Sequence, residues 1–118
     1  KDAIYKLLVA TMAGRSEGQR RRVACFAPYY ETFVSAPLLI TGASSVVLPC
    51  GPAGFPVPDD LAAALADRSL DIGAIIICSP NNPTGQVYPE SLLRGLAEAC
   101  RGFPSVLVIS DETYRSII

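Results

Sequence analysis

The sequence contains no histidine and no tryptophan, a single methionine and only two lysines among its 118 residues. Without histidine, the usual nitrogen ligand of zinc is absent. The four cysteines are Cys25, Cys50, Cys78 and Cys100, and no two of them have the Cys-x-x-Cys spacing typical of a zinc site. We therefore expect no metal site. We interpret the cysteines as reduced packing residues, as in a cytosolic protein.

Neither sign of charge dominates the chain, because it has 10 lysines and arginines and 11 acidic residues, which gives a net charge of −1. No overall field favours nucleic acid or anionic lipid. The longest apolar runs, residues 74–78 and 106–109, are far shorter than the ~20 residues of a membrane helix. We expect a small-molecule partner, with no nucleic acid and no membrane. The arginines at 15 and 20–22 are interpreted as a solvated surface run rather than an anion site.

Helical and strand-like segments alternate along the chain. Spacing of apolar residues and end signals predict helices over residues 2–13, 31–41, 59–68 and 89–101. Short apolar runs predict strands over 23–26, 45–48, 74–78 and 106–110. Pro37 either kinks the second helix or marks its true beginning. The alternation predicts an α/β fold with three layers (α/β/α) and a mainly parallel sheet, forming one domain over residues 1–118 without an internal boundary.

The order of the strands and the place of the functional residues can also be predicted. Strands 74–78 and 106–110 are nearly unbroken apolar runs, so we expect them to be adjacent, parallel and in the interior of the sheet. Strand 23–26 should lie on the other side of strand 74–78. Ligands bind beyond the carboxyl ends of strands in such sheets, so functional residues should follow the strands directly.

Three segments after predicted strands, residues 27–30, 79–85 and 110–115, carry polar and aromatic side chains. The string Asn-Asn-Pro-Thr-Gly at 81–85 is followed by Asp-Glu-Thr-Tyr at 111–114. Together and in this order, the motifs resemble the large domain of the class I/II aminotransferases, the aspartate-aminotransferase-like enzymes of fold type I. The resemblance implies a cytoplasmic, homodimeric enzyme that uses pyridoxal 5'-phosphate. Such an enzyme transfers an amino group between an amino acid and a 2-oxo acid.

The resemblance also implies a role for four residues. Asp111 would hold the protonated ring nitrogen of the cofactor. Asn82 and Tyr114 would donate hydrogen bonds to its ring hydroxyl, and Tyr30 would stack on the face of the ring. Each has an ordinary alternative. Asp111 can be a turn cap and Asn82 a turn residue before proline. Tyr114 can lie at a strand edge with its hydroxyl in water, and Tyr30 can be a packing residue, with Tyr29 competing for the stacking position.

The chain lacks the lysine that such enzymes bind covalently to the cofactor. Lys1 and Lys6 are its only lysines and precede every motif, so we assign no catalytic residue. We expect the chain to be part of a longer protein, with further residues on both sides. Other fold-type I enzymes acting on amino acids stay open alternatives: carbon–sulfur lyases, synthases, decarboxylases and oxidases. A noncatalytic α/β module is another, although no glycine-rich nucleotide motif is present.

Overall fold

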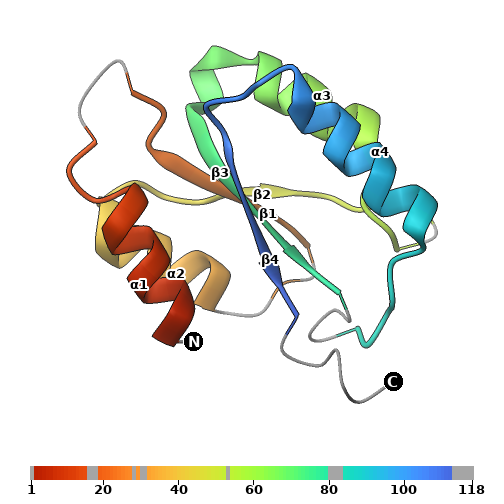
Figure 1. The fold of residues 1–118 in the computed structure, drawn as a ribbon, viewed down its shortest axis with the longest axis horizontal. Coiled ribbons are helices and arrows are strands. Elements are labelled where there is room, and N and C mark those ends of the chain that lie inside the picture. Colours follow the sequence, from red (N-terminus) through yellow and green to blue (C-terminus); the bar gives the residue numbers. More distant parts are fainter. Residues whose placement is uncertain are drawn as a thin grey trace.

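The computed structural model describes residues 2–15, 19–27, 29, 32–52, 54–79 and 84–112. Strands β1 (Arg22–Phe26), β2 (Val46–Leu48), β3 (Ile72–Cys78) and β4 (Leu107–Asp111) form one parallel sheet in the order β2-β1-β3-β4. Helices α1 (Asp2–Thr11) and α2 (Thr32–Thr41) cover one face of the sheet, and α3 (Pro58–Ala66) and α4 (Glu90–Arg101) cover the other (Figure 1). A short 3-10 helix, η1 (Arg68–Leu70), precedes β3. The predicted three-layer α/β fold is confirmed.

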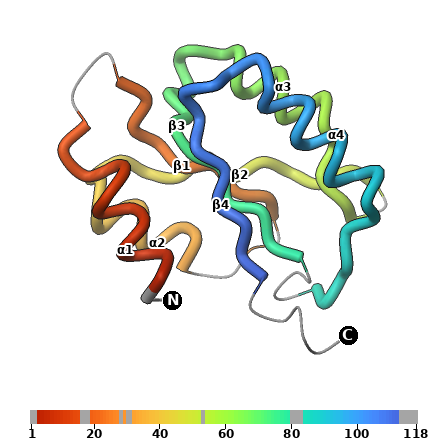
Figure 2. Tube along the Cα trace, in the orientation of Figure 1, coloured from red at the N-terminus to blue at the C-terminus, as the bar shows by residue number. Residues whose placement is uncertain are grey.

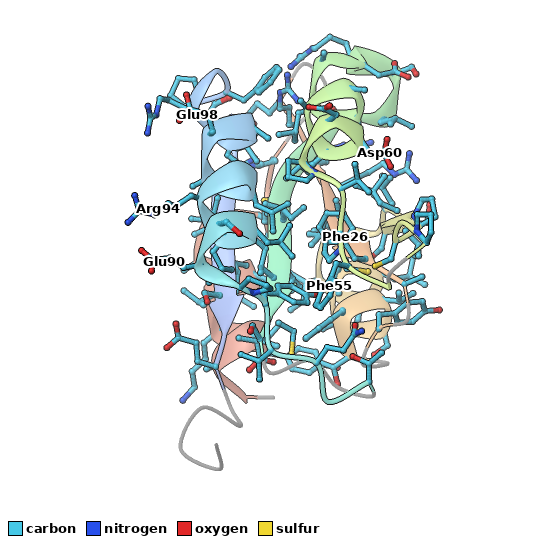
Figure 3. The ribbon with its side chains drawn as sticks, turned by 90° about the vertical axis from the view of Figure 1, so that its right-hand side faces the viewer. Phe26, Phe55, Asp60, Glu90, Arg94 and Glu98 are labelled. Atoms are coloured by element: carbon cyan, nitrogen blue, oxygen red, sulfur yellow. The ribbon has the colours of Figure 1, made fainter. Side chains whose placement is uncertain are left out.

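Strand β3 is the centre of the protein because all seven of its residues are buried. Its side chains alternate between the two faces of the sheet. Ile75 and Ile77 belong to the core beneath α3 and α4, whereas Ala74 and Ile76 belong to the core beneath α1 and α2. Phe26 of β1 lies under the α3–α4 layer (Figure 3). A strand buried on both faces reads as the continuous apolar run seen in the sequence.

The pairing of β4 confirms one prediction and corrects another. β4 is parallel to β3, with Val108 opposite Ile75 and Asp111 opposite Cys78, and β1 lies on the other side of β3 as expected. The predicted interior position of β4 is wrong for this chain, since β4 is the last strand of the described sheet. Val108 of this strand is accordingly 46% exposed.

Helix α2 includes Pro37 rather than beginning there. Proline has no N–H group to donate to the carbonyl oxygen of Phe33, one turn earlier. The hydroxyl of Ser45 donates to that oxygen instead, at 3.2 Å. The replacement hydrogen bond explains how the helix can begin at Thr32 and continue through a buried proline to Thr41.

The helix predicted over residues 59–68 is shorter than expected. α3 ends at Ala66 because Asp67 adopts an extended conformation. The Asp67 carboxylate accepts a hydrogen bond from the backbone N–H of Ser69 at 3.0 Å, which starts η1. Such local bonding between an aspartate and the backbone competes with helix continuation. Arg68 therefore belongs to η1 rather than to α3.

Candidate cofactor site

The segments that carry the motifs leave the sheet at one edge. β1, β3 and β4 are neighbours and parallel, so their carboxyl ends lie on the same side of the sheet. Ala27 follows β1, Ser79 follows β3, and Asp111 is the last residue of β4. Figures 1 and 2 show the ends of β3 and β4 next to each other. The three strand ends from which these segments leave therefore lie side by side.

Asp111 is the predicted site residue that the structure describes, and it lies next to α1. Its side chain is half-buried and lines a cavity of about 210 Å³. The other side of this cavity is formed by the first two turns of α1, through Ala3, Ile4 and Leu7. The exposed Glu112 also lines it, and its carboxylate accepts a hydrogen bond from Ser110 at 3.4 Å. Two acidic residues, Asp111 and Glu112, thus line a space next to the first two turns of a helix.

Hydrogen bonds connect Asp111 to the loop that begins at Ser79. The backbone N–H of Ser79 donates to the carbonyl oxygen of Asp111 at 3.3 Å. The Ser79 hydroxyl accepts a hydrogen bond from the backbone N–H of Tyr88 at 2.9 Å. Ser79 therefore holds together the end of β4, the start of the motif loop and the segment before α4.

Tyr88 supports this loop and was not identified from the sequence. It is 6% exposed, and its ring packs edge-to-face on Phe55 with centroids 6.0 Å apart. Burial, assisted by Cys50 and Cys78, raises the pKa of the Tyr88 phenol to about 12. The ring is a neutral packing group at physiological pH. The sequence signal for it is its position, an aromatic residue shortly before the start of α4.

The remaining predicted site residues, Tyr30, Asn82 and Tyr114, lie outside the described residues. Their roles stay predictions. Tyr29, the competing stacking candidate, is described and is 38% exposed.

The described residues fit a ligand that carries a positive charge at one end and a negative charge at the other. The Asp111 carboxylate would pair with a cationic group. The start of α1, across the same cavity, carries the partial positive charge of a helix N-terminus, which favours an anion. The chain is thus an α/β protein with a parallel sheet, a class in which ligands commonly bind beyond the carboxyl ends of the strands.

Comparison with known proteins identifies the family. The family model described as "Aminotransferase class I and II" matches residues 6–117. A bifunctional aspartate aminotransferase and glutamate/aspartate-prephenate aminotransferase from Petunia hybrida is 39% identical over 98% of this chain. A probable aspartate/prephenate aminotransferase from Thermus aquaticus is 38% identical over the whole chain. The chain belongs to the class I and II aminotransferase family.

Solved structures agree with this assignment. A double mutant of Thermus thermophilus aspartate aminotransferase superposes with a TM-score of 0.75 and 27% identity over 93% of this chain and 27% of its own. N-succinyldiaminopimelate aminotransferase from Mycobacterium tuberculosis gives a TM-score of 0.75 and 30% identity over 94% of this chain and 27% of its own. The chain spans only 23% of the Petunia relative and 29% of the Thermus aquaticus relative.

Proposed function

We propose that residues 1–118 form part of the cofactor-binding large domain of a pyridoxal-phosphate-dependent aminotransferase, without an internal domain boundary. The parent protein would transfer an amino group between an amino acid and a 2-oxo acid. The observation that carries this proposal is the position of Asp111, half-buried at the end of β4 and facing α1 across a cavity. The family match supports it.

Asp111 would hold a proton on the ring nitrogen of the cofactor. Bound pyridoxal phosphate supplies an electron sink for bond breaking at the α-carbon of the amino acid, and it does so well only with a protonated ring. A carboxylate next to the ring nitrogen favours the charged form of both groups. Because Asp111 is half-buried, water screens this interaction less than it would at an open surface.

The other contacts would fix the orientation of the cofactor. The backbone N–H groups at the start of α1 would bind the phosphate group, opposite Asp111. By the family resemblance, Asn82 and Tyr114 would donate to the ring hydroxyl and stabilise its ionised form. Tyr30 would stack on the ring, contributing on the order of 1 kcal/mol. The lysine for covalent attachment would come from another part of the parent protein.

Transamination is favoured over the other reactions that share this fold because the two relatives compared above carry aminotransferase names. The substrates would accordingly be an amino acid and a 2-oxo acid. We also propose a homodimeric, cytoplasmic parent enzyme, on the family resemblance. No helix within the described ranges has the length and apolar character needed to cross a membrane.

The proposal is tested by following the amino group itself. The intact parent protein, saturated with pyridoxal phosphate, is given ¹⁵N-labelled aspartate, glutamate or tyrosine together with a 2-oxo acid. We expect ¹⁵N to appear in a new amino acid, detected by mass spectrometry, and to be absent when the 2-oxo acid is omitted. Release of ammonia or carbon dioxide without a labelled amino acid product would instead indicate a lyase or a decarboxylase.

A further inference from the structure

Three arginines from separate segments line one cavity at the amino-terminal ends of the strands. Asp111 lies at the opposite, carboxyl-terminal ends. Arg15 and Arg20 come from the segment between α1 and β1, and Arg68 is the first residue of η1. The cavity measures about 250 Å³ and is completed by Gln19 and by Ser105, which precedes β4. Arg15, Gln19 and Arg20 precede β1, Arg68 precedes β3 and Ser105 precedes β4, so the cavity lies at the amino-terminal ends of these strands. The basic segment is therefore not simply a solvated surface run.

Two of these arginines are fixed in place by backbone carbonyl groups. Arg15 donates from Nε to the carbonyl oxygen of Thr11 at 3.0 Å and from Nη1 to that of Arg20 at 2.7 Å. Arg20 donates from Nη1 to the carbonyl oxygens of Leu65 and Ile72, both at 3.1 Å. Its guanidinium also lies over the Phe103 ring, 5.5 Å from the centroid. Their remaining donors are thus held in fixed directions.

Several donors around the cavity have no acceptor within the described part of the chain. A guanidinium group has five N–H donors in a rigid fork. Nη2 of Arg15, Nε and Nη2 of Arg20, and the whole Arg68 guanidinium donate to no described protein atom. Arg15 and Arg20 are already held by backbone carbonyl groups, so their unused donors can bind a ligand without an ordering cost in these two side chains.

The local charge is also incompletely balanced. Burial and, to a smaller extent, the positive charge of Arg68 lower the pKa of Arg20. The negative charge of the nearby Asp71 raises this pKa, but by less than the other two effects lower it. The Asp71 carboxylate is already engaged, since it accepts a hydrogen bond from the backbone N–H of Arg21 at 3.2 Å. An anion placed between Arg20 and Arg68 would relieve the repulsion between these two cations.

We propose that this cavity binds a phosphate group, either inorganic phosphate or a small phosphate monoester. Phosphate oxygens match the forked donors of arginine, and the Ser105 hydroxyl adds a neutral donor. A volume of about 250 Å³ admits a phosphate group with a small organic substituent. The site is separate from the proposed cofactor site, because the two lie at opposite ends of the strands.

The test uses the intact protein with its cofactor bound, so that the cofactor's own phosphate site is filled. Isothermal titration calorimetry is carried out with inorganic phosphate and, separately, with glycerol 3-phosphate in a low-salt buffer. We expect saturable binding of at least one of them that weakens as salt is added. Arg68→Ala should raise the Kd about tenfold, the loss of one charge-assisted contact.

Arg94→Ala is the matched control, because Arg94 is an exposed arginine on α4 that pairs only with Glu90 within the described residues (Figure 3). It should leave the Kd unchanged. A readout independent of substitution is the NMR signal of the arginine Nε–H groups, of which those of Arg15 and Arg20 should shift on addition of phosphate. The proposal is overturned if neither ligand shows saturable binding, or if Arg68→Ala and Arg94→Ala weaken it equally.

Discussion

Asp111 illustrates how position in the fold gives a single side chain its chemistry. An aspartate after a strand is commonly a turn residue in contact with water. Here the side chain is half-buried and faces the start of α1. Its backbone is held by the N–H group of Ser79, so the carboxylate is attached to a rigid strand end rather than to a free loop. Such support is what a residue needs to keep a cofactor in a fixed orientation.

Cys25 provides a residue-level prediction about pH. It is fully buried, and burial raises the pKa of its thiol from 9.0 to about 11. The unfolded chain therefore ionises first, so the stability due to the neutral buried thiol is complete below pH 9 and is lost as pH rises to about 11. In the intact protein, Tm should fall more steeply across this interval in wild type than in Cys25→Ala.

Differential scanning fluorimetry at a series of pH values measures both slopes. Cys25→Ala should have a lower Tm than wild type at neutral pH, because it leaves a small cavity. That offset does not affect the comparison of slopes. Parallel Tm profiles for the two proteins above pH 9 would show that this thiol does not contribute to the pH dependence.

At the level of elements, Gly73 determines how β1 and β3 meet. The register between these strands shifts at Arg22 and Val23, which pair with Ile72 and Ala74 and leave Gly73 in an irregular position. A Cβ atom at Gly73 would clash with the carbonyl oxygen of Arg20 and with the Arg15 guanidinium. A glycine in a strand commonly marks such a close approach of another backbone.

Gly73→Ala should therefore lower the free energy of unfolding of the intact protein by on the order of 3 kcal/mol, measured by urea denaturation. Gly102→Ala is the control, because no atom lies within 4 Å of the added Cβ and the φ of −72° suits alanine. It should be neutral or slightly stabilising. Equal effects of the two substitutions would contradict the proposed packing at Gly73.

How far each element could be predicted depends on where its determinants lie. β3 was predictable because its residues are apolar in sequence and buried on both faces. The edge position of β4 was not, since an apolar run indicates a strand without showing what covers its far side. The motif that begins at the end of β4 located Asp111, but the contact of its cavity with α1 arises only from the fold. The meeting of Arg20 with Arg68 likewise depends on topology rather than on a sequence pattern.

At the scale of the whole molecule, one side of the chain is incompletely covered. A cavity of about 540 Å³ lies between α4 and β4 and is lined mostly by apolar side chains, including Leu93, Phe103, Val106 and Val108. β4 also has no strand on its outer side within the described residues. Exposed strand edges and apolar grooves promote association between chains.

The isolated 118-residue chain should consequently self-associate, whereas the intact parent should give a defined oligomer. Size-exclusion chromatography with light scattering distinguishes the two. Val108→Lys places a charge on the exposed edge strand and should reduce association of the isolated chain. If the isolated wild-type chain stays monomeric at the concentration used for Val108→Lys, the exposed side of β4 does not mediate association between chains.

The central claim is that Asp111 keeps the ring of the cofactor protonated, and the direct measurement is the single-turnover rate of amino-group transfer by the intact, cofactor-saturated protein. Asp111→Ala should slow this step by a factor on the order of a hundred or more. Asp60→Ala, which removes an exposed carboxylate from α3, should leave it unchanged. Normal transfer by Asp111→Ala would contradict the claim and reduce Asp111 to a turn residue.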